Sequence, residues 1–430
     1  MKTSKPPNAK LAGRGLPWWR KLARFFMVMG PGIIVMQADT EAGSITTAAV
    51  AGARYGFELV GLLLLLVLPL YVIQEMTARL GSVTGKGLSY LIRHKFGLKW
   101  AWFSLAMLFV CNVAALVTEF AGIISAGNMA NIPPIVSVAV SGVLLLTVVM
   151  TGKYRRAETI VFVFCLIDLL FIPAAFLIHP DWGQVFHNSF TFHPENFNKD
   201  YLLIVIGLIG AVIMPWKIYY QKSAVADKNL TVKDLGFEQW DTAIGAVLTE
   251  LIMAFIVIAI GATLYVNHLS INDASQAAQA LIPLAGRYAG LLFALGLVSA
   301  AFLGAFVVAL STAWAFGETF GWSHSLNDRP REAKLFYSFY ALGVLIAAMI
   351  VLIPDIPLVT ITVLVEAGNA LLLPIVLCFL LLLANDRKLL GDYVNNWFSN
   401  LFAIGMGVII VALGMLSAAM TLFADWTFWK

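Results

Sequence analysis

Two carboxylates, Asp39 and Glu41, lie in the middle of the first long apolar stretch of the chain. A charged side chain at the centre of a membrane helix costs about 2.5–3.5 kcal/mol, so such a side chain faces a cavity, a charged partner or a cargo. The neighbouring Gly43 and Ser44 favour locally unwound backbone, which membranes tolerate only where protein encloses it. We therefore expect residues 37–44 to line a binding site.

The composition assigns the chain to the polytopic membrane proteins. Of its 430 residues, 60% are hydrophobic and only 12% are charged, which excludes a soluble globular domain and a disordered chain. Apolar windows of about 20 residues recur, each long enough to cross a bilayer as a helix. The short alternating segments of barrel strands are absent. The predicted fold class is therefore an all-α polytopic membrane protein.

Other classes of function have no support in the sequence. No basic face with interleaved aromatic side chains indicates a nucleic-acid partner. No pairing of nucleophile and base indicates an enzyme, and no motif indicates a cofactor. The three cysteines, Cys111, Cys165 and Cys378, lie inside apolar stretches and predict no disulfide framework. The expected partners are the lipid bilayer and a transported solute, and we expect a monomer.

Hydropathy predicts eleven membrane spans. They lie near residues 26–53, 58–78, 101–128, 133–151, 158–178, 201–222, 241–266, 290–317, 336–354, 357–384 and 401–424. Residues 26–178 and 201–384 form two predicted five-span repeats, 401–424 is the eleventh span and 1–25 is a basic tail. The two longest connections, 179–200 and 267–287, are polar. Lysines and arginines concentrate in the tail and in alternate connections, which predicts a cytoplasmic N-terminus and an external C-terminus in the cytoplasmic membrane.

A second interruption lies in the sixth span, where Met214-Pro215-Trp216-Lys217 places a proline and a lysine inside an apolar helix. Proline removes a helix hydrogen bond and frees a carbonyl upstream. The first and sixth spans occupy corresponding positions in the two predicted repeats. Interrupted segments in such positions indicate a midplane binding site in a transporter built from inverted repeats.

Several motifs together resemble the NRAMP (natural resistance-associated macrophage protein) family of divalent-metal transporters. They are Gly30-Pro31-Gly32, residues 51–56 (AGARYG), residues 74–81 (QEMTARLG), Met214-Pro215-Trp216 and residues 385–391 (NDRKLLG). The resemblance implies a LeuT-type fold of two inverted five-helix repeats, with spans one and six broken and the eleventh helix peripheral. It also implies a secondary transporter that works by alternating access.

The resemblance further implies a metal site, and this chain departs from the family pattern there. Glu41 stands where the family has an aspartate, Ser44 stands for an asparagine, and Asp39 adds a carboxylate. Glu366 falls at the position of a glutamine that faces the site. The implied metal ligands are Asp39, Glu41, Ser44, the backbone carbonyl of Ala211 and Met214. The residues implied to contact the substrate are the same five together with Lys217 and Glu366.

The positions that the family associates with proton movement are also altered. Glu119 keeps a carboxylate, but Trp216 and Gln221 stand where the family has histidines. Proton coupling is therefore in doubt. These departures resemble a divergent branch of the family that carries magnesium. Carboxylate, carbonyl and hydroxyl oxygens suit Mg²⁺ or Mn²⁺, and of these two cations we favour Mg²⁺.

Lys217 leaves two interpretations open. In the first, its side chain faces the cytoplasmic water cavity or pairs with Glu250 or Glu366 and stabilises the bundle. In the second, its ammonium pairs with Glu41 or Asp39 in place of an ion, because an ammonium and a divalent cation repel each other strongly in a poorly solvated site. The second interpretation implies a small organic solute, such as an amino acid, as the cargo.

Overall fold

The computed structural model describes residues 30–150, 154–191, 193–269, 271 and 274–422, and every regular element in these ranges is helical. The predicted tail at 1–25 lies outside the described residues. The first predicted repeat and the connection after it contain α2 (Pro31–Gln37), α3 (Ala42–Tyr55), α4 (Val60–Thr84), α5 (Leu88–Phe96), α6 (Leu98–Met129), α7 (Pro134–Val149), α8 (Tyr154–Asp168), α9 (Phe171–Phe176) and α10 (Trp182–Ser189).

The second predicted repeat begins after a short 3-10 turn, η1 (Pro194–Asn196). Its helices are α11 (Lys199–Val212), α12 (Pro215–Asp227), α13 (Leu235–Ile260), α14 (Ala274–Phe320), α15 (Lys334–Val351) and α16 (Leu358–Ala384). A 3-10 turn, η2 (Val232–Asp234), precedes α13, and a π-helical turn, η3 (Gly261–Tyr265), extends it. The chain closes with α17 (Arg387–Leu390), the turn η4 (Gly391–Tyr393) and α18 (Trp397–Leu422).

Helical segments lie at each of the eleven predicted span positions. In the described ranges, eight helical segments are long and apolar enough to cross a membrane. The broken pair α2 and α3, the shorter α7, and the pair α8 and α9 occupy the other three predicted positions. The prediction of an all-helical polytopic membrane protein is therefore confirmed.

Both long polar connections contain helix that hydropathy does not reveal. The segment 179–200 holds α10, which begins where the Asp181 side chain accepts hydrogen bonds from the backbone N–H groups of Gly183 and Gln184. In the segment 267–287 the long helix α14 already begins at Ala274. Its first residues, ASQAAQA, are too polar for a hydropathy window but rich in alanine, the strongest helix former.

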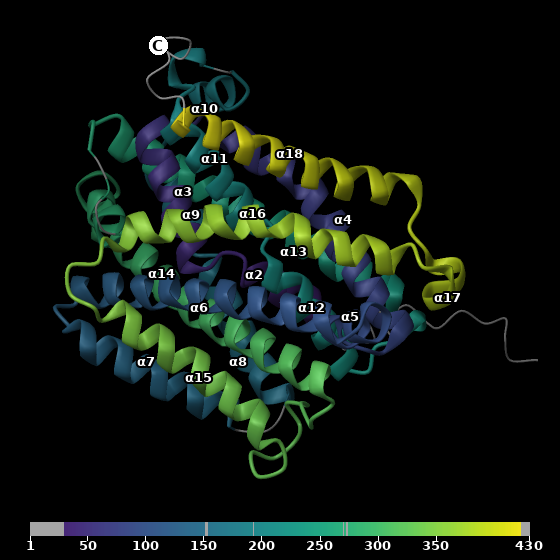
Figure 1. The fold of residues 1–430 in the computed structure, drawn as a ribbon. Helices are drawn as coiled ribbons and strands as arrows, with labels where there is room; N and C mark the ends of the chain where they lie inside the picture. The colour runs from purple at the N-terminus through teal and green to yellow at the C-terminus, as the bar shows by residue number, and fades with distance from the viewer. Residues whose placement is uncertain (1–29, 151–153, 192, 270, 272–273, 423–430) are drawn as a thin grey trace, which may run out of the picture.

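The two broken helices occupy the middle of the bundle. Figure 1 shows α2 and α12 near the centre of the view, where α2 packs against α13 and α12 packs against α4 and α14, with α18 along the outer edge. Leu401, Ile404, Val408 and Met415 of α18 are each more than half exposed. Such an apolar face is suited to lipid, and the eleventh helix is peripheral, as the sequence predicts.

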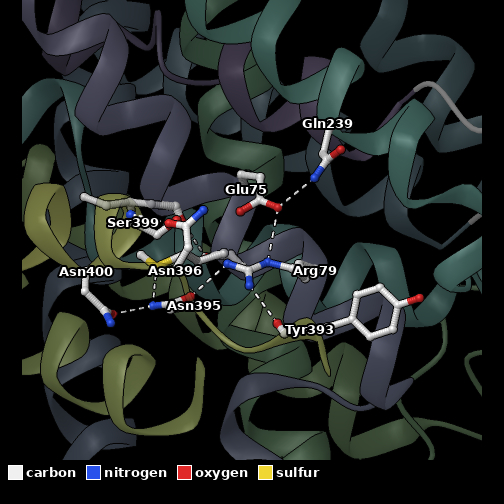
Figure 2. Close-up of polar contacts among 11 residues, drawn as sticks. Glu75, Arg79, Gln239, Tyr393, Asn395, Asn396, Ser399 and Asn400 are labelled. Carbon is white, nitrogen blue, oxygen red and sulfur yellow. Dashed lines mark hydrogen bonds and ion pairs between the residues drawn. The ribbon is translucent and has the colours of Figure 1, made fainter. Parts of the chain in front are cut away.

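A hydrogen-bonded cluster, which we call the Arg79 network, fastens the chain before α18 to the core (Figure 2). The Arg79 guanidinium donates to the carbonyl of Tyr393 at 2.7 Å and to the side-chain oxygen of Asn395 at 2.8 Å. It also pairs with Glu75 at 3.2 Å, and Gln239 of α13 donates to the same carboxylate. Charged bonds with fixed fork geometry are strong, so this network holds α4, α13 and the approach to α18 together.

Candidate functional site

The first span breaks at residues 38–41, between the end of α2 at Gln37 and the start of α3 at Ala42. Because a helix N-terminus carries unpaired backbone donors, the new start at α3 needs an acceptor. Glu119 of α6 supplies it, accepting from the Ala42 N–H at 3.1 Å. The break exposes Asp39 and Glu41 to the protein interior, where their side chains are 1% and 0% exposed to solvent. The predicted break in span one is confirmed.

A residue that the sequence reasoning missed determines where α2 begins. The Asp241 carboxylate of α13 accepts hydrogen bonds from the backbone N–H of Gly30, at 3.2 Å, and of Gly32, at 2.7 Å. Pro31 at the first helical position has no N–H to satisfy. A carboxylate at a helix N-terminus is also favoured by the helix dipole. Asp241 therefore anchors the N-terminal end of α2, the short helix that leads to Asp39.

The sixth span breaks between Val212, the last residue of α11, and Pro215, the first of α12. Proline cannot donate a backbone hydrogen bond, so carbonyls at the end of α11 are left without helical partners. Lys217 uses two of them, donating its ammonium to the carbonyls of Ala211 at 2.9 Å and Val212 at 2.7 Å. The Ser44 hydroxyl also donates to the Ala211 carbonyl, at 3.2 Å.

The two breaks are joined by an ion pair between Lys217 and Asp39. Of the partners that the sequence leaves open for Lys217, this geometry selects Asp39. Lys217 and Ser44 are both fully buried, as is Asp39 to within 1%. Glu250 and Glu366, both fully buried, lie within electrostatic reach of the same ammonium. The ion pair, the Ala211 carbonyl and the Ser44 hydroxyl thus form one contiguous polar site, which we call the Lys217 site.

A second group of carboxylates lies beside the Lys217 site. Glu41 and Glu119 are both fully buried, and the Glu119 carboxylate accepts from the backbone N–H of Ala42, the residue that follows Glu41. A side-chain carbon placed at Gly304 of α14 would collide with Glu119 and lie 2.9 Å from the Cβ of Glu41. A carbon placed at Gly43 would likewise collide with the Glu366 carboxylate. Small residues at these two positions therefore let helices close tightly around three buried acids.

Two of the predicted residues have other partners. The thioether sulfur of Met214 accepts the indole N–H of Trp216 at 2.9 Å, so the sulfur is already engaged as a hydrogen-bond acceptor. Gln221 donates to the hydroxyl of Thr242 on α13 at 2.9 Å, away from the Lys217 site. In the described ranges, no three or more histidine, cysteine, aspartate or glutamate side chains are grouped to hold a metal ion. The oxygens around the breaks are instead shared with the Lys217 ammonium.

The fold and the site together define a class: a membrane transporter of the LeuT type, with two broken helices meeting over buried charges. The model of the family "Natural resistance-associated macrophage protein-like", or Nramp, matches residues 32–419. The chain therefore belongs to the Nramp family, a family of transporters and not of enzymes. The resemblance inferred from the sequence motifs is confirmed at this level.

Relatives agree with this assignment, and solved structures share the fold. A divalent metal cation transporter of Caldanaerobacter subterraneus is 25% identical over 423 residues, which cover 94% of each chain. Another, of Ralstonia nicotianae, is 30% identical over 302 residues and 66% of each chain. Among structures, a manganese transporter of Eremococcus coleocola matches with a TM-score of 0.75 and 17% identity over 97% of this chain and 91% of that one. MhsT in complex with L-phenylalanine matches with a TM-score of 0.58 and 12% identity, over 90% and 97%.

Proposed function

We propose that this protein carries a divalent metal cation across the membrane by alternating access, with the cargo bound between the two helix breaks. The observation that carries the proposal is the meeting of Asp39, Ser44 and the Ala211 carbonyl, buried and contiguous, in a chain of the Nramp family. Relatives of this family bear the name of divalent metal cation transporters. Buried charges of this kind in a membrane protein mark an ion pathway.

We propose Mg²⁺ as the preferred cargo and Mn²⁺ as its main competitor. Support comes from the donor atoms. The Met214 sulfur, the one soft donor assigned from the sequence, accepts a hydrogen bond from Trp216. The remaining donors are carboxylate, carbonyl and hydroxyl oxygens, which suit hard cations. A Mg²⁺ ion that keeps several of its waters needs only one or two carboxylates, and Asp39 and Glu41 supply two.

The orientation and the driving force follow from the charge pattern. The basic connections that hold α5 and α17 lie at one end of the bundle in Figure 1, and α10 lies towards the other. By the positive-inside rule the basic end is cytoplasmic. In alternating access, the two five-span repeats, 26–178 and 201–384, rock around the central site. Entry is driven by the membrane potential. Gln221 cannot titrate and donates to Thr242, which leaves Glu119 as the remaining candidate for proton coupling.

Uptake into proteoliposomes tests the cargo. Purified wild-type protein and the variants Glu41→Ala and Lys217→Ala are supplied with Mg²⁺, Mn²⁺ or a panel of amino acids. We expect Mg²⁺ and Mn²⁺ uptake by the wild type, its loss in Glu41→Ala, and no amino-acid uptake. Asp392→Asn, which removes an exposed carboxylate outside the spans, is the control. Amino-acid uptake without metal flux would instead favour the carrier of small organic solutes.

The basis of the cation preference has its own test. Trp216→Phe removes the indole N–H that the Met214 sulfur accepts while keeping an aromatic ring. We expect this variant to gain uptake of a soft cation such as Cd²⁺ relative to Mg²⁺, because the thioether becomes available as a ligand. An unchanged ratio would contradict the link between Trp216 and selectivity.

A further inference from the structure

We infer that Lys217 is a tethered counter-cation that makes the site selective for divalent over monovalent ions. This inference rests on the proposed cation transport and adds to it a residue that decides which valence is carried. In this view the Lys217 ammonium occupies the site whenever the cargo is absent. A cation from solution binds only by displacing it.

The contacts of the ammonium are those of a bound ion. Lys217 pairs with Asp39 across the two breaks and donates to the carbonyls of Ala211 and Val212, at 2.9 and 2.7 Å. One carboxylate and two backbone carbonyls are oxygen ligands of the kind that hard cations take. The Lys217 side chain is 0% exposed. Lys217 lies in the first turn of α12, directly after the break.

The surrounding charges explain why displacement would depend on valence. The Asp39 carboxylate pairs with the Lys217 ammonium, and the buried acids Glu250 and Glu366 lie within its electrostatic reach. A monovalent ion that replaces the ammonium brings the same single charge to these acids and gains no additional attraction. A divalent ion brings twice the charge, and in a poorly solvated interior this difference is large.

A second buried lysine on the same helix provides the comparison. Lys222 is also 0% exposed, but its ammonium donates to the carbonyl of Gly87, at the start of α5, at 3.3 Å. Its acidic neighbour is Glu318 of α14. Lys222 therefore lies in the middle of α12, about 1.4 turns after Lys217, and among the described residues its hydrogen bond and its acidic neighbour are on α5 and α14 and not at either break. Removing it tests the loss of a buried ammonium without emptying the Lys217 site.

The experiment compares Na⁺ with the bulky cation N-methyl-D-glucamine, at equal ionic strength of about 0.15 M. Mn²⁺ binding is measured by calorimetry on the detergent-purified full-length wild type, Lys217→Gln, Lys217→Met and Lys222→Gln. For the wild type and Lys222→Gln we expect the same Mn²⁺ affinity in both salts. For Lys217→Gln and Lys217→Met we expect Mn²⁺ to bind about tenfold tighter without Na⁺, and Na⁺ to remove that gain.

A second measurement does not depend on Mn²⁺. Because a bound ion stabilises the folded state, Na⁺ should raise the melting temperature of the two Lys217 variants and leave that of the wild type unchanged. The double variant Asp39→Asn with Lys217→Gln removes one charge of each sign, and we expect it to lose the Na⁺ response again.

The outcomes separate this inference from the proposed function. Two results would overturn the role of Lys217 as a counter-cation. The first is competition by Na⁺ in the wild type, and the second is an equal lack of Na⁺ response in the wild type and in folded Lys217 variants. If no protein binds Mn²⁺ or Mg²⁺ but Na⁺ stabilises only the Lys217 variants, the counter-cation stands and the divalent cargo is wrong.

Discussion

The contact between Asp241 and the start of α2 permits a quantitative prediction. Asp241→Ala removes the acceptor for two buried backbone N–H groups, those of Gly30 and Gly32. A buried donor left without a partner costs about 1–3 kcal/mol. Two such donors give about 2–6 kcal/mol, and we expect a loss of about 3 kcal/mol in the free energy of unfolding, since water reaches part of the emptied space. Asp241→Asn keeps one acceptor oxygen, and because Oδ2 alone accepts from both N–H groups, we expect a smaller loss than in Asp241→Ala.

Steric trapping in detergent micelles measures this free energy for each variant. The matched control is Glu238→Ala, three residues earlier on the same helix. Glu238 is equally buried, but neither of its carboxylate oxygens has a hydrogen-bond partner. Removing an unpaired buried carboxylate is neutral or stabilising. Equal losses in Asp241→Ala and Glu238→Ala, or a loss in Asp241→Ala below about 1 kcal/mol, would refute the role of Asp241 as the anchor of α2.

Three further predictions concern other parts of the molecule. Gly304→Ala should abolish metal uptake while the protein still reaches the membrane, because the added carbon collides with Glu119. Normal uptake would contradict the close approach of Gly304 to Glu119. Arg79→Lys should lower the free energy of unfolding by about 2 kcal/mol, since a single ammonium cannot make all the bonds of the guanidinium. An unchanged midpoint of chemical denaturation would show that the Arg79 network is dispensable. The hydrogen bond from Lys95 lowers the pKa of Asp386. This carboxylate therefore stabilises the fold above its unfolded pKa, near 3.9, and its contribution is lost as pH falls through the lowered value. Asp386→Asn should flatten the acid limb of a plot of stability against pH, and an identical acid limb in wild type and variant would count against this prediction.

The sequence predicts the two breaks because each carries a local signal. The buried carboxylates at Asp39 and Glu41 and the proline at Pro215 mark the interruptions to within a few residues. The partners of those breaks carry no such signal. Asp241 lies 209 residues along the chain from Gly32, and only the packing of α13 against α2 brings them together. An acidic pair at the start of an apolar span, Glu238 with Asp241, is the one clue that the sequence offers.

Lys217 shows a different limit of the sequence. Its long side chain can reach acids on several neighbouring helices, and the choice among them depends on how α12 is rotated relative to α2. The Met214 sulfur presents the same difficulty, because its neighbour Trp216 is close enough to donate to it. Residue type and spacing predict which atoms are available, whereas the direction of a helix determines which pairs form.

Asp39, Glu41, Ser44 and Lys217 are all at most 1% exposed to solvent. Side chains buried in this way meet an ion from solution only when the bundle opens, and motions of that size take microseconds to milliseconds. The protein should therefore be electrically silent in single-molecule current recordings. Its flux should level off as the external concentration rises, at a ceiling that is determined by the opening of the helices and not by diffusion.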